Sequence, residues 1–455
     1  MKSFTLYGWL VCAWVLTVSF QYGYHISALN QLQDVLTCRR IDTSTPVHYG
    51  LPTCILMNDA TFSLVTSLFT LGGLCGSLLA NIAMDRYGRK GATRISSVCN
   101  AVGALLSAVA ASVTAIALGR FIVGFAAGVG ICVGPIYLAE TAHPNIRGNP
   151  CRSSGVGTQL AIVIGIMVTQ VMGFGLATPK HWRLVLFISA ALSIVQCFMS
   201  PVITESPVYL KRIGLPEQQK RALQRLWSDY IHRDSEELVD QPLLSNEEMP
   251  RPAVGNRATV TLPQLFRTPE LRRPLFIAVF AMTSQQLSVL YYSNAILSRA
   301  LPALAPYVSL VITVVNFLMT FPPIFLIERL GRKQLIQLSV AGAILSHLAV
   351  GYGLNTGMVA ISSVAIAVFV MSFAIGLGPV PFVIIPEVAP SHVQLLLPSS
   401  TNHLSGIMNF VVGLVFLPLR NFLADGDPMK EGRVFYVFAV ALLCSSLAFS
   451  KFYRR

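Results

Sequence analysis

Amide side chains interrupt several of the long apolar stretches in this sequence. They are Gln159, Gln170, Gln285, Gln286, Asn316 and Asn409. Because an amide both donates and accepts hydrogen bonds, such groups suit a neutral ligand with several hydroxyls, each of which also does both. Phe382, Tyr291, Tyr292 and Phe410 could add apolar faces beside them. For any single amide, a hydrogen bond between two helices is an equally good interpretation.

A second group of residues is charged and occurs in two copies of one short pattern. Asp85-Arg-Tyr-Gly-Arg89-Lys lies between two apolar stretches, and Glu328-Arg-Leu-Gly-Arg332-Lys repeats it much later in the chain. The glycine permits a tight turn, and the flanking charges can pair with neighbouring helix ends. A simpler alternative is that these charges only anchor the chain at a membrane surface.

His25 is a histidine well inside the first apolar stretch. It could titrate near neutral pH and couple a proton to the protein's activity. A hydrogen-bonded core histidine is the alternative, and we favour it because His25 stands alone on its helix. No carboxylate occupies the central part of any predicted span, which argues against a metal-cation pump.

The composition defines the elements that must position these residues. Of 455 residues, 54% are hydrophobic and 12% are charged, and the mean hydropathy is +0.63, whereas soluble domains carry about 25% charge. Apolar stretches of about 20 residues, the length that spans a bilayer, recur along the chain. We predict an all-α membrane protein with twelve transmembrane helices at residues 7–29, 60–82, 95–117, 118–138, 158–178, 183–203, 275–297, 306–327, 335–354, 363–386, 402–422 and 433–452.

Basic residues cluster after alternate spans. The clusters are Arg86, Arg89, Lys90 and Arg94; Arg147 and Arg152; Arg329, Arg332 and Lys333; and Lys451, Arg454 and Arg455. Positive residues gather on the cytoplasmic side of membranes, so both termini are predicted to be cytoplasmic. The net charge of +13 is therefore explained by this placement of basic residues and does not indicate nucleic-acid binding. Cys38 and Cys54 share a loop on the opposite side, where a disulfide could form; the sequence alone leaves that pairing open.

A long polar stretch divides the chain into two related halves. We predict an N-terminal six-helix bundle at 1–203, a cytoplasmic loop at 204–274 and a C-terminal six-helix bundle at 275–455. Within the loop, helical spacing at 216–230 predicts a short amphipathic helix at the membrane surface. The glycine turn motif and a Pro-to-Glu motif both repeat in the same order at nearly equal spacing. Parallel repeats of this kind place a substrate site between the bundles and predict transport by rocking.

Taken together, the motifs resemble the sugar porter branch of the major facilitator superfamily, which contains facilitative glucose transporters and proton-coupled sugar symporters. The motifs are Gly72-Gly73-x-x-Gly76 before the first glycine turn, Gly119-Arg120, Pro135-x-Tyr137-x-x-Glu140 with Arg147-Gly148, Glu205-Ser-Pro207, Gln285-Gln286-Leu-Ser288 with Tyr291-Tyr292, the second glycine turn, and Gly376-x-Gly-Pro-x-Pro381. The segment 22–30 and the two loop cysteines are most similar to a fungal glucose-transporter-like subgroup, which implies a vacuolar membrane as one possible location and the plasma membrane as the other.

The resemblance implies roles for individual residues. A sugar would contact Gln159, Gln285, Gln286, Asn316 and Asn409, with Phe382 at a position that usually holds Trp. A cytoplasmic charge network would contain Asp85, Arg89, Glu140, Arg147, Glu328, Arg332 and Glu387. His25 stands where symporters of this family carry Asp and facilitators carry Asn, which implies that coupling through the usual carboxylate is lost.

The sequence also departs from the family pattern. About four residues that usually follow Ser288, including a sugar-binding Asn, are missing, and Val208 and Gln394 stand where Arg is usual. We nevertheless predict a facilitative transporter of a hexose or polyol that works by alternating access. The alternative is a membrane nutrient sensor or trafficking-related paralogue with little transport. No catalytic constellation stands out, so we predict neither enzyme activity nor a cofactor, and the sequence does not indicate an oligomeric state.

Overall fold

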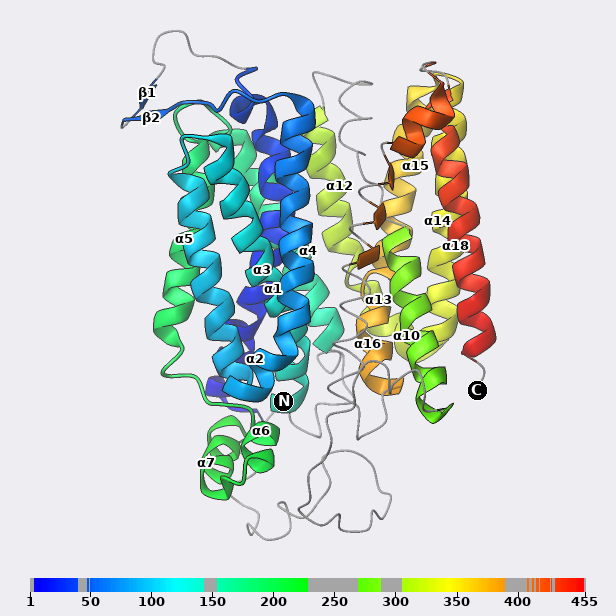
Figure 1. The fold of residues 1–455 in the computed structure, drawn as a ribbon. Coiled ribbons are helices and arrows are strands. Elements are labelled where there is room, and N and C mark those ends of the chain that lie inside the picture. Colours follow the sequence, from blue (N-terminus) through cyan, green and yellow to red (C-terminus); the bar gives the residue numbers. More distant parts are fainter. Residues whose placement is uncertain are drawn as a thin grey trace.

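The chain forms two adjacent groups of long helices, shown in Figure 1. A computed structural model describes residues 4–39, 47–48, 50–142, 154–227, 269–287, 305–388, 407–408, 411–412, 415–416, 418–425, 427 and 430–453. Helices α1 to α5 make up one group, and α10 to α18 make up most of the other. Both marked chain ends lie at the same end of the molecule, with helices α6 and α7 just beyond it.

Among the described residues, five helices build the first group. They are α1 (Leu6–Leu36), α2 (Asp59–Ala108), α3 (Val113–Thr141), α4 (Ser154–Leu176) and α5 (Trp182–Met199). Helix α2 has 50 residues and contains two predicted spans, because Gly88 interrupts it with a φ of 75° and a ψ of −179°. That conformation is open essentially to glycine alone. The predicted turn at the first copy of the charged motif is therefore confirmed.

One predicted boundary in this half was wrong. We placed the junction of the third and fourth spans at residues 117 and 118, whereas α2 ends at Ala108 and α3 begins at Val113. Ser112 caps α3 by accepting a hydrogen bond from the backbone N–H of Ala115 at 3.3 Å. The chain is apolar on both sides of this serine, so hydropathy offers no break, and the N-cap residue alone marks the junction.

Small residues bring α2 and α3 into close contact. A Cβ atom built on Gly72 would lie 2.1 Å from the carbonyl oxygen of Phe121, and one on Gly128 would lie 2.0 Å from that of Gly73. Any larger residue would force the helices apart. The hydrophobic effect does not drive helices together inside a bilayer, because lipid tails are as apolar as the side chains. Close backbone packing therefore contributes more to stabilising the α2–α3 pair.

The second group contains shorter and more broken helices. The described elements are α10 (Pro269–Leu287), α12 (Ala305–Met319), α13 (Pro322–Leu330), α14 (Arg332–Asn355), α15 (Val359–Ser372), the π-helical turn η4 (Phe373–Leu377), α16 (Val380–Val388) and α18 (Arg433–Phe452). Proline explains two of the breaks, since it cannot donate within a helix. Pro322 begins α13, and Pro379 separates η4 from α16.

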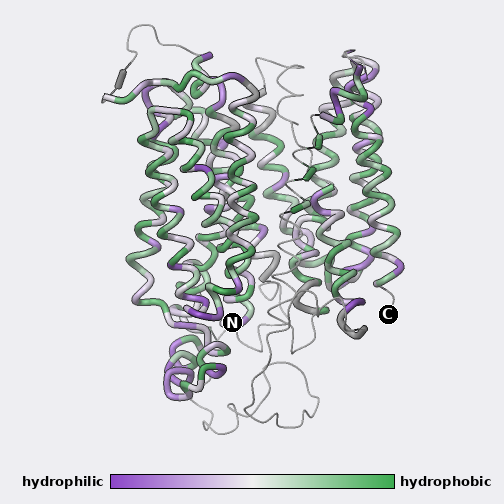
Figure 2. Tube along the Cα trace, in the orientation of Figure 1, coloured by the Kyte–Doolittle hydropathy of each residue, from purple (hydrophilic) through white to green (hydrophobic). Residues whose placement is uncertain are grey.

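Seven helical stretches among the described residues are long and apolar enough to cross a membrane. The twelve predicted spans exceed this count partly because α2 holds two of them and a break divides the eighth between α12 and α13. The seventh and eleventh predicted spans lie only partly within the described residues. Described helical residues nevertheless fall on all twelve spans, and Figure 2 shows that hydrophobic residues recur along the helices of both groups.

The segment after α5 folds onto the end of the first group. Helices α6 (Pro207–Arg212) and α7 (Pro216–Leu226) form a pair, and this part of the chain is rich in hydrophilic residues (Figure 2). Leu223 and Leu226 are buried with Val11 and Trp14 of α1. The predicted amphipathic helix therefore exists, but its apolar face packs on protein, where we had expected the membrane surface. Residues 228–230 of the predicted helix lie outside the described residues.

On the opposite end, strands β1 (Val47–His48) and β2 (Leu51–Pro52) form a small antiparallel hairpin. Cys38 and Cys54 are joined by a disulfide across this loop. Trp182 at the start of α5 donates from its indole nitrogen to the carbonyl of Thr53 at 2.7 Å, and Arg183 donates to the carbonyl of Pro52 at 2.9 Å. The pairing that the sequence left open is therefore formed, and the loop is fastened to α5.

Candidate functional site

Two of the predicted ligand amides approach one backbone position from different halves of the chain. Gln285, on α10, donates a hydrogen bond from Nε2 to the carbonyl oxygen of Gly378 at 3.0 Å. Gln159, on α4, lies beside the same residue, because a Cβ atom on Gly378 would be 3.4 Å from its Nε2. Both glutamines are buried. The structure thus gathers polar groups of both halves around Gly378.

Local chain geometry explains why Gly378 offers its carbonyl there. The π-helical turn η4 ends with a hydrogen bond from the Gly378 N–H to the Phe373 carbonyl at 2.8 Å. Pro379 follows, and its missing N–H interrupts the helix before α16. Turns with π-helical bonding occur often at functional positions. The sequence indicated a proline-rich motif here but not that its backbone meets the glutamines.

The remaining predicted ligand residues have varied surroundings. Phe382 is partly buried against Ala278 and Met282 of α10, and Gln286 is half-buried. Asn316, on α12, has a buried side-chain oxygen with no hydrogen-bond partner among the described residues. A buried acceptor of this kind calls for a donor, which a ligand hydroxyl could supply. Asn409 lies outside the described residues, so its role stays a prediction.

His25 belongs to a row of hydrogen bonds between α1 and α5. Its Nε2 lies 2.6 Å from the hydroxyl of Ser189. One turn away, the side-chain oxygen of Gln21 accepts from Asn100 at 2.5 Å and from Ser193 at 3.0 Å. This row fits the interpretation of His25 as a hydrogen-bonded core residue. Sequence reasoning missed its partners because isolated serines in apolar helices carry little signal.

Arg120 is the buried cation nearest to His25. Its Nη1 donates to the carbonyl oxygen of His25 at 3.1 Å, and its guanidinium carbon lies 4.6 Å from the centre of the Phe69 ring. A backbone carbonyl and an aromatic face both stabilise a guanidinium. Among the described residues no carboxylate forms an ion pair with Arg120. The contact joins α1, α2 and α3.

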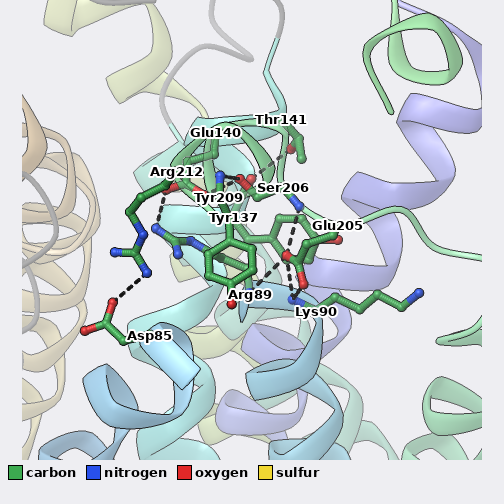
Figure 3. A network of polar contacts seen from close by, with 10 residues as sticks. All are labelled: Asp85, Arg89, Lys90, Tyr137, Glu140, Thr141, Glu205, Ser206, Tyr209 and Arg212. Atoms are coloured by element: carbon green, nitrogen blue, oxygen red, sulfur yellow. Dashed lines mark hydrogen bonds and ion pairs between the residues drawn. The ribbon is translucent and has the colours of Figure 1, made fainter. Parts of the chain in front are cut away.

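The predicted charge network is present in part, at the end of the first group that carries α6 and α7 (Figure 3). Arg89 Nη2 lies 2.8 Å from Glu140 Oε1, and these side chains are 1% and 11% exposed. The other oxygen of Glu140 accepts from the hydroxyl of Ser206 at 2.5 Å. The Arg89 guanidinium also lies 5.2 Å from the Tyr209 ring. These contacts hold α2, α3 and α6 together.

Glu205 is a central member of this network that the sequence did not single out for a role. Its Oε1 accepts hydrogen bonds from the backbone N–H groups of Arg89 at 3.0 Å, Lys90 at 3.1 Å and Ser206 at 2.8 Å. It therefore caps the helical segment that starts after Gly88. Burial raises the pKa of Glu205, while these hydrogen bonds and the charge of Arg89 oppose that rise. The signal available was its place in the Glu-Ser-Pro motif directly after a span.

The rest of the predicted network has less structural support. Asp85 forms an ion pair with Arg212 at 2.9 Å, with side chains 50% and 41% exposed. In the second half, Gly331 repeats the positive φ of Gly88, at 80°, and Arg332 begins α14. Arg147 and the side chains of Glu328 and Glu387 lie outside what the structure describes. Their membership in a second network therefore stays a prediction.

Two related groups of membrane-spanning helices, with a repeated glycine turn and amides of both halves meeting at one point, define a multi-pass membrane transporter of the major facilitator fold. The chain belongs to the sugar (and other) transporter family, which matches residues 11–453. Its likeness to solved structures supports the same fold. The proton:xylose symporter XylE bound to 6-bromo-6-deoxy-D-glucose has a TM-score of 0.75 at 17% sequence identity, covering 98% of this chain and 96% of that one.

Relatives of similar length agree with this family assignment. The chain is 32% identical over 451 residues to the bovine solute carrier family 2, facilitated glucose transporter member 3, covering 93% of this chain and 85% of that protein. It is also 28% identical over 448 residues to vacuolar protein sorting-associated protein 73 of Saccharomyces cerevisiae, covering 95% and 90% of the two chains. The predicted resemblance to sugar porters is therefore confirmed.

Proposed function

We propose that this protein carries a neutral monosaccharide of the hexose class, or a related polyol, across a membrane by alternating access. The observation that supports this most directly is the approach of Gln159 and Gln285 to Gly378. Each amide can donate to one sugar hydroxyl and accept from another. The buried acceptor of Asn316 and the ring of Phe382 would add one polar and one apolar contact.

Ligand amides on both halves suggest how binding and movement are linked. A sugar held by Gln159 of α4 and by Gln285 of α10 would connect the two helix groups. Binding promotes the change of state only if the two states hold the sugar differently. The network of Arg89, Glu140 and Glu205 joins helices of one half, so we propose that it keeps the first group rigid while the groups rock.

We further propose that transport is facilitative. His25 is hydrogen-bonded to Ser189, and its neighbour Arg120 is held by a carbonyl and a phenyl ring. Neither arrangement needs a proton to be taken up and released. We place both termini in the cytoplasm and the protein in the plasma or vacuolar membrane. Transport is favoured over a sensing or trafficking role because ligand amides are retained in both halves.

Uptake into proteoliposomes tests this proposal. Purified protein would be assayed with a panel of radiolabelled hexoses and polyols, with and without an imposed proton gradient. We expect saturable uptake of at least one of these compounds and no change in the final accumulation when the gradient is applied. Accumulation that follows the gradient would contradict the facilitative mechanism, and His25→Asn would then show whether His25 carries the proton.

A further inference from the structure

The hydrogen bond between Gln285 and Gly378 connects a candidate ligand amide to the break between η4 and α16, which we call the Gly378 joint. Gln285 lies near the end of α10, and Gly378 lies between η4 and α16. Four residues after Gly378, Phe382 of α16 packs against Ala278 and Met282 of α10. The two contacts share one face of α10. The apolar contact therefore fastens α10 to α16, and the hydrogen bond fastens α10 to the residue between η4 and α16.

The Gly378 joint is a weak point of its helix. Pro379 cannot donate to the carbonyl of Ile375, as an α-helix would require, and the preceding turn is π-helical. A side chain at position 378 would also press on its neighbours, because a Cβ atom there would lie 3.2 Å from the Phe373 ring and 3.4 Å from Gln159 Nε2. Contacts from outside the helix must therefore help to fix its direction at this point.

We propose that Gly378 is a positioning residue of the transport cycle, whose carbonyl competes with the sugar for the Gln285 amide. This inference rests on the proposed function. Gln285 Nε2 carries two N–H groups, and the bond to Gly378 uses one of them. A sugar hydroxyl that accepts from this N–H has to take it from Gly378. Sugar binding then frees the joint before α16. A carrier that returns without sugar keeps the bond and reorients more slowly.

The proposal predicts a kinetic asymmetry. Exchange of sugar across the membrane uses only loaded carriers, whereas net uptake needs the unloaded carrier to return. The ratio of the maximal rate of equilibrium exchange to that of net uptake therefore measures how much more slowly the carrier reorients without sugar than with it. A buried hydrogen bond contributes about 0.5–1.5 kcal/mol net, so removing this one should lower the ratio by about two- to tenfold.

Matched substitutions separate this effect from the loss of a ligand contact. Gln285→Met removes the donor to Gly378 and keeps the side-chain length, and Gln159→Met makes the same change at the other amide. Both variants should bind sugar more weakly. Only Gln285→Met should bring the ratio of exchange to net uptake close to one. A wild-type ratio in Gln285→Met, or an equal fall in Gln159→Met, would overturn the proposal.

A second measurement applies even if Gln285→Met transports too slowly for kinetics. Hydrogen–deuterium exchange of the segment 373–388 in the wild-type protein should rise when a transported hexose is added, and Gln285→Met should show the raised exchange without hexose. Protection of the segment by hexose in the wild type would contradict the proposal. Wild-type protein that neither exchanges nor takes up any hexose or polyol would instead contradict the proposed function itself.

Discussion

The carboxylate of Glu205 occupies the space that a side chain at Gly88 would need. A Cβ atom on Gly88 would lie 2.4 Å from Glu205 Oε2. The same carboxylate accepts the first backbone N–H groups of the helical segment that follows. Gly331, the counterpart in the second half, has a similar backbone conformation, but no atom of the residues that the structure describes lies within 4 Å of its Cβ position. In the first half, the missing side chain of Gly88 therefore leaves room for the Glu205 carboxylate.

This difference predicts unequal effects of one substitution at the two turns. Gly331→Ala should cost about 1–3 kcal/mol through its unfavourable φ alone. Gly88→Ala carries the same cost and also displaces Glu205, which removes a helix cap worth about 1 kcal/mol. Thermal unfolding of the two purified variants in detergent would compare them. Equal losses of stability would show that Glu205 does not depend on the glycine.

A second prediction concerns pH. Because burial raises the pKa of Glu205 above its usual 4.5, the stability that this group contributes is greatest below that value and declines as pH rises through the raised pKa. Glu205→Gln removes the titration and keeps one acceptor. The unfolding temperature of the wild type minus that of the variant should therefore fall as the pH rises above about 4.5. A difference that grew with pH would mean that the hydrogen bonds outweigh burial.

The two ion pairs of the charge network should differ in strength. Glu140→Ala leaves the Arg89 guanidinium buried without its partner, which should cost about 3–5 kcal/mol. Asp85→Ala breaks an exposed pair with Arg212 and should cost about 0–1 kcal/mol. Chemical or thermal unfolding gives both values. Replacing Arg89 and Glu140 together by Met should recover much of the larger loss; no recovery would indicate that Glu140 acts through Ser206 instead.

The disulfide of the β1–β2 loop predicts a response to reducing agents. It closes a loop with a sequence separation of 16, so its loss should cost about 3 kcal/mol. The double variant Cys38→Ser and Cys54→Ser should unfold at a lower temperature than the wild type, and a reductant should lower only the wild-type value. If the reductant lowers both equally, reduction of a different disulfide is responsible.

Much of the fold followed from the sequence because its signals are local. Hydropathy located the spans, and the glycine of each charged motif marked a turn with a positive φ. Those features depend on a few neighbouring residues and on the bilayer. The same local basis explains the error between α2 and α3, where α2 ends at Ala108 and Ser112 caps the start of α3 without any fall in hydropathy.

The site was less predictable because its contacts join distant residues. The amides were visible as polar residues in apolar stretches, but their meeting at Gly378 depends on how α4 and α10 pack against the joint before α16. Glu205 lies far from Arg89 in the chain, so nothing near either residue indicates that one caps the helix of the other. The partners of His25 and Arg120 were hidden for the same reason.

Sugar transport through Gln159 and Gln285 is the central claim of this account. Its most direct test is radiolabelled hexose uptake into proteoliposomes containing equal amounts of the wild type, Gln159→Ala or Gln285→Ala. Each substitution should lower uptake at limiting sugar by about tenfold or more, since a lost hydrogen bond and an unpaired partner each weaken binding. Wild-type uptake equal to that of empty liposomes, or full uptake by both variants, would contradict the claim.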